Sequence, residues 1–95
     1  MSGLTFLDYS MKIHGRGGHE VTFQVARQAT SAGVQYNAWL SDEGRYIIQK
    51  RDLSDTTNIP TTYYYGKTAG SFATDWTGRS GLTYVEFNTM FDNIT

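Results

Sequence analysis

Short segments rich in Thr, Tyr and Val are separated by glycines along most of this chain, which contains 10 Gly and only 1 Pro. β-branched and aromatic residues favour extended strands, whereas glycine favours turns. Good helix formers are sparse, and they do not recur at helical spacing over three turns. The sequence therefore predicts an all-β protein, either a small antiparallel sandwich or a partly open barrel, with five to six strands.

The aromatic residues predict where the core is anchored. They make up 15% of the 95 residues, against 18% for charged residues, and most of the rings lie in residues 60–91. A disordered chain has few aromatics and many charges, and large rings bury the most apolar area per residue. The length gives room for one core, so we interpret residues 1–95 as a single β domain. Residues 1–19 are interpreted as an N-terminal arm and a glycine loop, with a bulged strand over residues 4–13 as the alternative.

Alternation of side chains predicts the individual strands. Residues 34–40 and 45–53 are predicted to form a hairpin, and residues 61–67 to pair with the second of these strands in a meander. Residues 82–88 are predicted to form the closing strand. Residues 20–29 fit either a strand or a helix, and their β-branched content favours the strand.

One stretch between the last two predicted strands has helical spacing. Phe72 and Trp76 are four residues apart, and Arg79 follows three residues later. One helical turn would place both rings on one face and bring Arg79 beside Trp76 for a cation–π contact, unless Arg79 pairs with Asp75 instead. The rings either plug the open end of the sheet or form a displayed aromatic–arginine patch typical of interface hot spots. The apolar tail, residues 89–95, is predicted to pack on its own domain or on another subunit.

Composition argues against several classes of function. The net charge is −1, which argues against a general attraction to nucleic acid or anionic lipid. The absence of cysteine excludes disulfides, thiolate catalysis and cysteine-based zinc sites. No apolar run approaches the about 20 residues of a membrane span, and the N-terminus lacks the pattern of a signal peptide. We therefore expect no membrane association.

Catalytic patterns are weak. His14 and His19 flank a glycine-rich loop, but a zinc site would also need a ligand such as Asp8 or Glu20, so we interpret both as exposed loop imidazoles. The available carboxylate pairs, residues 42/43 and 52/55, lie in predicted turns, where Asp normally bonds the local backbone. No nucleophile motif is present. We expect no enzyme activity, no cofactor and no metal.

The segment RYIIQKRDL, followed by TTYYYGKTAGSFATDWTGRSGLTYVEF, resembles small uncharacterised proteins of tailed phages. The resemblance covers residues 34–87 and includes a Y-x-I-x-K strand and an F-x-x-x-W-x-x-R-x-x-L-T-Y ending. It implies a virion-associated part of the head, neck or tail rather than an enzyme. The residues of that ending are Phe72, Trp76, Arg79, Leu82, Thr83 and Tyr84.

The favoured function is a non-enzymatic structural or interaction protein of a phage virion, located in the virion or the host cytoplasm. It would bind copies of itself as a homo-oligomer and other virion proteins. The candidate interface residues are Trp39, Tyr64, Arg79 and Phe91.

The alternative function is a small single-stranded nucleic-acid-binding β-barrel, because aromatic and basic residues on neighbouring strands can hold a single strand. Its candidate residues are Tyr46, Lys50, Arg51 and Tyr64. A metal-assisted hydrolase at His14 and His19 ranks third.

Overall fold

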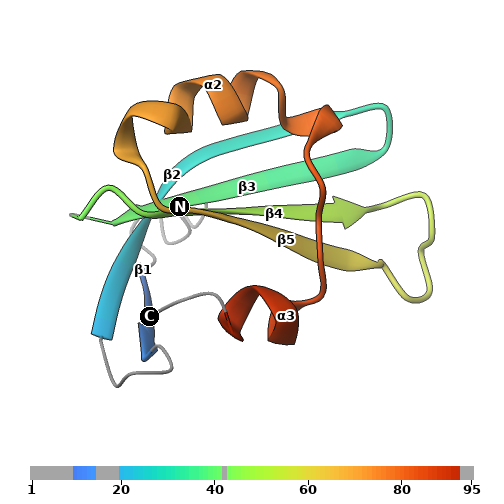
Figure 1. Cartoon of the computed structure of the whole chain (residues 1–95). Coiled ribbons are helices and arrows are strands. Elements are labelled where there is room, and N and C mark those ends of the chain that lie inside the picture. The colour runs from blue at the N-terminus through green and yellow to red at the C-terminus, as the bar shows by residue number, and fades with distance from the viewer. Residues whose placement is uncertain (1–9, 15–19, 42, 93–95) are drawn as a thin grey trace, which may run out of the picture.

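A computed structural model describes residues 10–14, 20–41 and 43–92. The described chain is mostly β. Its strands form one antiparallel sheet in which each strand pairs with its neighbours in sequence, in the order β1-β2-β3-β4-β5 (Figure 1). The strands are β1 (Ser10–His14), β2 (Glu20–Ser31), β3 (Val34–Ser41), β4 (Tyr46–Asp52) and β5 (Thr61–Gly66).

Several strand predictions are confirmed. Residues 20–29 belong to β2, so strand rather than helix is the correct assignment there. The predicted hairpin is formed by β3 and β4, in a register that pairs Val34 with Asp52 and Leu40 with Tyr46. The predicted meander is completed by β5, which pairs with β4. Of the predicted arm and glycine loop, residues 1–9 and 15–19 lie outside the described residues.

The described strands form a single open layer covered by helices on its two faces, rather than the predicted sandwich or partly open barrel. Helix α2 (Phe72–Thr77) lies on one face and helix α3 (Phe87–Asp92) on the other (Figure 1). We call these the α2 face and the α3 face. Two short 3₁₀ helices, η1 (Ala69–Ser71) and η2 (Arg79–Gly81), flank α2. In the described residues, helices rather than a second sheet cover the faces of the sheet.

The predicted closing strand over residues 82–88 is wrong. Only Val85 pairs with β5, through two backbone hydrogen bonds with Tyr63 of 2.7 and 2.8 Å, and α3 already begins at Phe87. The reason is the position of the two helices. Because α2 and α3 cover opposite faces, the segment between them has to cross the edge of the sheet at β5, and a crossing chain cannot run alongside that edge for long (Figure 1).

Both faces of the sheet carry a hydrophobic cluster, because successive side chains of a strand point to opposite faces. In β4, the consecutive residues Tyr46, Ile47 and Ile48 are all at most 1% exposed, which is possible only where both faces are covered. The α2 face holds Tyr36, Ala38, Tyr46 and Ile48, with Phe72, Trp76, Leu82 and Tyr84 packed on them. The α3 face holds Ile13, Val21, Phe23, Trp39, Ile47 and Met90.

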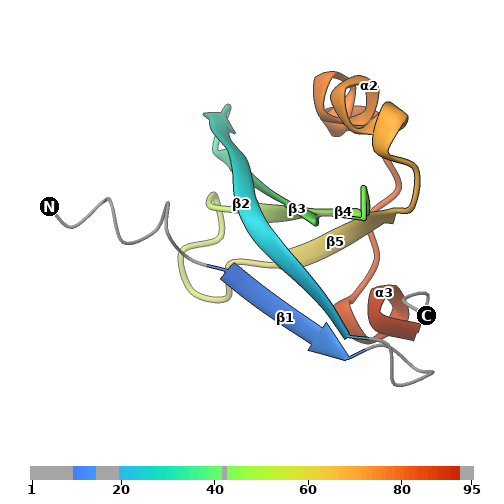
Figure 2. The ribbon, with the colours of Figure 1, turned by 90° about the vertical axis from the view of Figure 1, so that its left-hand side faces the viewer.

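A β-bulge in β2 changes which residues face each side. Val25 pairs with Trp39 on the α3 face, but the register then shifts, so that Arg27 pairs with Ala38 on the α2 face. A bulge also bends its strand, and β2 curves along its length in Figure 2. The first half of β2 therefore contributes Val21 and Phe23 to the α3-face cluster.

Strands β2 and β3 are joined by a two-residue turn. Ala32 and Gly33 both have positive φ, 52° and 80°, as a tight hairpin turn of the primed type requires. Strand β2 extends to Ser31, so the turn consists of Ala32 and Gly33 alone. Ala32 of this turn lies close to Arg79, at the end of the sheet next to α2 and η2.

Candidate functional site

Helix α2 is held on the sheet by the two rings that the sequence placed on one helical face. Phe72 lies edge-on to Tyr46, with 5.1 Å between ring centroids. Trp76 packs on the same α2-face cluster. The helical turn is confirmed, and the packing of Trp76 agrees with its interpretation as a plug.

Arg79 is stacked against two aromatic rings. Its guanidinium carbon lies 4.5 Å from the ring centroid of Trp76 and 5.5 Å from that of Tyr36. Its Nη1 also donates a 2.8 Å hydrogen bond to the carbonyl of Trp76. The hydroxyl of Tyr84 donates a 2.8 Å bond to the carbonyl of Arg79 itself. The predicted cation–π contact with Trp76 is confirmed.

Asp75 does not pair with Arg79 but accepts a hydrogen bond from the hydroxyl of Tyr46. Burial, followed by this hydrogen bond, raises the pKa of Tyr46 well above its ordinary value. Burial is also the main cause of the raised pKa values of Tyr64 and Tyr84, to which the charge of Asp75 adds. This tyrosine cluster stays protonated at neutral pH, so it contributes hydrogen bonds and packing rather than a reactive base.

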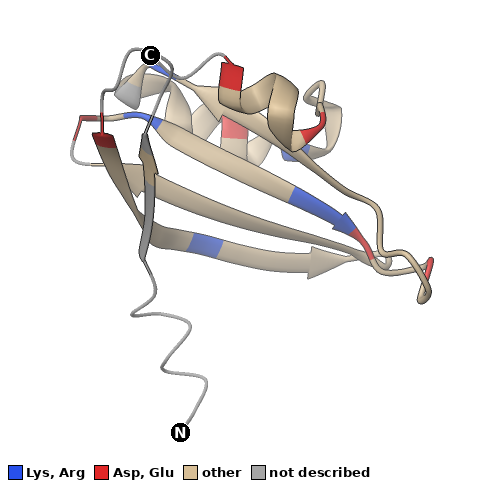
Figure 3. Cartoon of the chain, turned by 90° about the horizontal axis from the view of Figure 1, so that it is seen from below, with Lys and Arg blue, Asp and Glu red and all other residues tan. Residues whose placement is uncertain are grey.

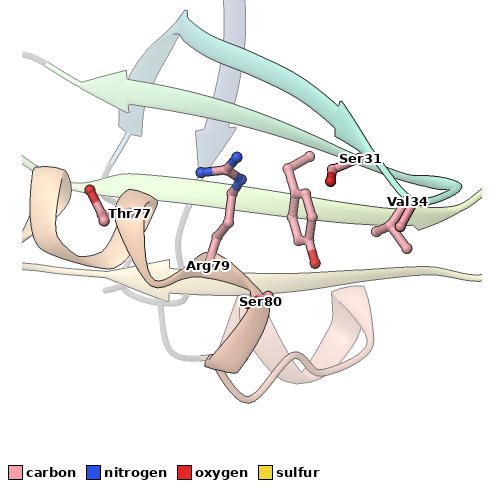
Figure 4. A pocket seen from close by; sticks show the side chains of 7 residues that line it. Ser31, Val34, Thr77, Arg79 and Ser80 are labelled. Carbon is pink, nitrogen blue, oxygen red and sulfur yellow. The ribbon is translucent and has the colours of Figure 1, made fainter.

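Beside Arg79 the surface is hollowed into a pocket of about 290 Å³, shown in Figure 4. One wall comes from the β2–β3 hairpin and the other from the end of α2 and the start of η2. Arg79 is the only charged residue that lines it. The lining residues are Ser31, Ala32, Val34, Tyr36, Thr77, Arg79 and Ser80.

The four predicted interface residues do not lie on one surface. Trp39 is 7% exposed in the α3-face cluster, so it is part of the core rather than of the surface of the monomer. Phe91 is half-buried on that face and stacks on Phe87 with 6.1 Å between centroids. Tyr64 and Arg79 lie on the α2 face, where Tyr64 packs between Tyr46 and Tyr84.

The four predicted nucleic-acid-binding residues are also separated. Tyr46 is 1% exposed beneath Phe72. Lys50 lies over the ring of Tyr84 at 5.5 Å on the α2 face, near Tyr64. Arg51, the next residue of β4, points to the other face and donates a 2.7 Å hydrogen bond to Gln35. A single strand could not contact all four residues at once.

The Lys and Arg residues of the described chain do not gather into a basic surface. Lys50 and Arg51 are consecutive in β4 and are followed by Asp52. Figure 3 shows the other Lys and Arg positions scattered over the described strands and helices. An electrostatic groove for nucleic acid requires clustered basic residues. The described residues offer no such cluster.

Metal and acid–base sites were predicted to be absent. Among the described residues no group of three or more His, Cys, Asp or Glu is placed to hold a metal ion. His19 lies outside the described residues, as does Asp42, and nothing is described of the His14 side chain. Asp52 and Asp55 accept hydrogen bonds from the backbone of their own turns, the structural role predicted for them. The hydrogen bonds from Ser54 lower the pKa of Asp52.

Sequence reasoning missed two features of the surface. Phe87 is 42% exposed on α3, whereas the sequence placed it in a strand. Tyr36 lies in a predicted strand, but no local signal showed that Arg79 would stack on it. Both features depend on the path by which residues 67–92 pass from one face of the sheet, round the edge at β5, to the other face.

In comparisons with known proteins, no family model, no curated protein and no solved structure matches the chain. Among the described helices, none has the length and apolar character needed to cross a membrane.

Proposed function

We propose that this protein is a non-enzymatic structural and interaction protein that assembles with copies of itself, as a component of a phage virion. The observation that carries the proposal is an aromatic patch formed by α3 and the neighbouring strand β5. Phe87 is 42% exposed, stacks on Phe91, and lies edge-on to Tyr63 with 5.4 Å between centroids. We call these three residues the α3 patch.

The α3 patch has the properties of an interface centre. Helix α3 is anchored by Met90, which is 1% exposed. The rings of Phe87 and Phe91 on this helix are therefore held in place. Rigid aromatic side chains lose little entropy on binding and dominate the energy of many interfaces. In a symmetric dimer the same patch meets itself, and aromatic faces are self-complementary. The net charge of −1 opposes such pairing only weakly.

The virion assignment is supported by the resemblance of residues 34–87 to small tailed-phage proteins. Virion proteins work in symmetric assemblies, where many weak contacts add through avidity. The head, neck and tail all fit this reasoning. Mass spectrometry of purified phage particles whose genome encodes this protein tests the assignment, and absence of the protein from the particles would contradict it.

Self-association is tested by light scattering coupled to size-exclusion chromatography over a range of concentrations. The unmodified protein is expected to elute as a defined oligomer. Phe87→Arg places a charge at the centre of the α3 patch and should shift the protein towards monomer. Asn88→Arg adds the same charge at the neighbouring exposed position of α3 and should leave the oligomer in place.

Two results would contradict the proposal. One is a monomer at every concentration of the unmodified protein. The other is an equal response to Phe87→Arg and Asn88→Arg, which would make the effect one of charge rather than of the aromatic surface. Circular dichroism of both variants shows whether the fold is retained.

A further inference from the structure

We propose that the pocket beside Arg79 binds a carboxylate carried on a small apolar group, such as the C-terminal residue of a peptide or a small organic acid. The proposal does not depend on self-association, because the pocket lies on the α2 face and the α3 patch on the opposite face.

The first argument is that the cation is already in place. Arg79 is held over Trp76 and Tyr36 at 4.5 and 5.5 Å, and its Nη1 is tied to the carbonyl of Trp76 at 2.8 Å. An arginine on a free surface loses side-chain entropy when it binds an anion. Here the folded structure has already restricted the side chain, so less entropy remains to be lost on binding.

The second argument is that the binding edge of the guanidinium is unused. Among the described residues, no hydrogen bond engages Nε or Nη2 of Arg79, and no carboxylate forms an ion pair with it. The Nε–Nη2 edge has the geometry that matches a carboxylate with two parallel hydrogen bonds. Figure 4 shows the guanidinium extending from η2 towards the strands, with Thr77 on one side and Ser31 and Val34 across the pocket.

The third argument concerns the rest of the lining. The hydroxyls of Ser31, Thr77 and Ser80 can donate to an anion, and none of them forms a hydrogen bond with another described side chain. Ala32 and Val34, at the hairpin end, supply an apolar wall. A pocket with one positive charge, several hydroxyls and an apolar wall is complementary to a monoanion with an aliphatic body.

A phosphate fits this lining less well. A phosphate group carries close to two negative charges at neutral pH and is usually bound by several cations or by a row of backbone N–H groups. The pocket offers Arg79 as its only cation. A single carboxylate balances that charge, so the carboxylate is the favoured ligand.

The test uses N-acetylvaline and its neutral analogue N-acetylvalinamide, titrated into the ¹⁵N-labelled full chain and followed by NMR, with calorimetry for affinity. N-acetylvaline is expected to shift the amide resonances of the pocket, including those of Val34, Arg79 and Ser80. N-acetylvalinamide should bind at least roughly tenfold more weakly, since it lacks the charge-assisted bonds. Equal binding of the two compounds, tighter binding of inorganic phosphate, or no shift at the pocket would overturn the proposal.

Variants connect the binding to Arg79. Arg79→Gln should weaken N-acetylvaline roughly tenfold or more. Lys67→Gln removes the same charge at an exposed position outside the pocket and should leave the affinity unchanged. Arg79 also packs on two rings, so its loss can perturb the fold. Ser80→Asp keeps those contacts and places a carboxylate at the pocket wall, where it should block N-acetylvaline; unchanged binding by Ser80→Asp would contradict the assignment.

A last comparison identifies the source of the carboxylate. A pentapeptide ending in valine is titrated with a free C-terminus and with an amidated one. Tighter binding of the free-acid peptide than of N-acetylvaline supports the pocket and assigns it to a peptide terminus. Similar binding of the two supports the pocket and assigns it to a small acid. Equal binding of the free and amidated peptides counts against the proposal.

Discussion

The ring of Tyr46 lies across Gly66, its directly opposite partner in the β4–β5 register. A Cβ built at Gly66 would be 2.1 Å from Cζ of Tyr46, far inside van der Waals contact. The absence of a side chain at Gly66 is therefore what allows the ring to occupy this position and to bring its hydroxyl to Asp75. This hydrogen bond joins the sheet to α2, in addition to the packing of Phe72 and Trp76.

Gly66→Ala should destabilise the protein by about 1–3 kcal/mol, because the added methyl group forces the Tyr46 ring or the strand to move. Urea denaturation measures the change in the free energy of unfolding. Gly81→Ala is the matched control, since a Cβ at Gly81 meets nothing within 4 Å. In a Tyr46→Leu background the cost of Gly66→Ala should shrink; an undiminished cost would show that the ring is not its cause.

Alkaline pH should destabilise the protein through the tyrosine cluster. Burial raises the pKa values of Tyr46, Tyr64 and Tyr84 above the ordinary 10.0. Above pH 10 the unfolded chain releases these protons while the folded chain retains them, so the folded state binds more protons and stability falls as pH rises. Below pH 10 the contribution is fully present.

The measurement is urea denaturation as a function of pH, with tyrosine ionisation followed by ultraviolet absorbance. Tyr46→Phe should fall less steeply in stability above pH 10 than the unmodified protein, because one of the raised groups has been removed. Ionisation of every tyrosine near pH 10 in the folded protein would contradict the prediction.

Ala32→Asn should stabilise the β2–β3 turn by roughly 1 kcal/mol, because Ala32 has a φ of 52° and asparagine tolerates this left-handed conformation better than alanine. Gly33→Ala should act in the opposite direction. Its φ is 80°, and a Cβ there meets no atom within 4 Å, so backbone strain is the only cost. Thermal unfolding of both variants checks the signs, and a loss of stability in Ala32→Asn would contradict the account.

Met90→Ala should cost about 2–5 kcal/mol, since Met90 is 1% exposed and anchors α3 to the cluster of Phe23, Trp39 and Ile47. Asn88→Ala, at an exposed position of the same helix, should have little effect. Both are compared by urea denaturation. Equal, small changes in the two variants would mean that α3 is not held by Met90.

Local sequence patterns were sufficient for the elements whose signals lie within a few residues. Alternation placed β3, β4 and β5, and the spacing of Phe72, Trp76 and Arg79 indicated the helical turn and its cation–π contact. A pattern of this kind is decided by neighbouring side chains alone.

The sequence could not indicate what covers each face of the sheet. Residues 82–88 alternate as a strand does, yet they cross the edge of β5 and lead into α3, because the chain has to pass from the α2 face to the α3 face. The same crossing left Phe87 exposed. Trp39 is buried in the monomer because it shares a cluster with Met90 of α3 on the same face.

The sequence by itself determined that this is a β-rich chain, that its central strands form a meander, and that the guanidinium of Arg79 contacts the ring of Trp76. The tertiary structure alone decided that the two faces are capped by helices, and that Arg79 faces a hairpin more than forty residues earlier in the chain. The physical reason is range. Strand and turn preferences act between adjacent residues, whereas a pocket and a surface patch depend on contacts between segments that only the folded chain brings together.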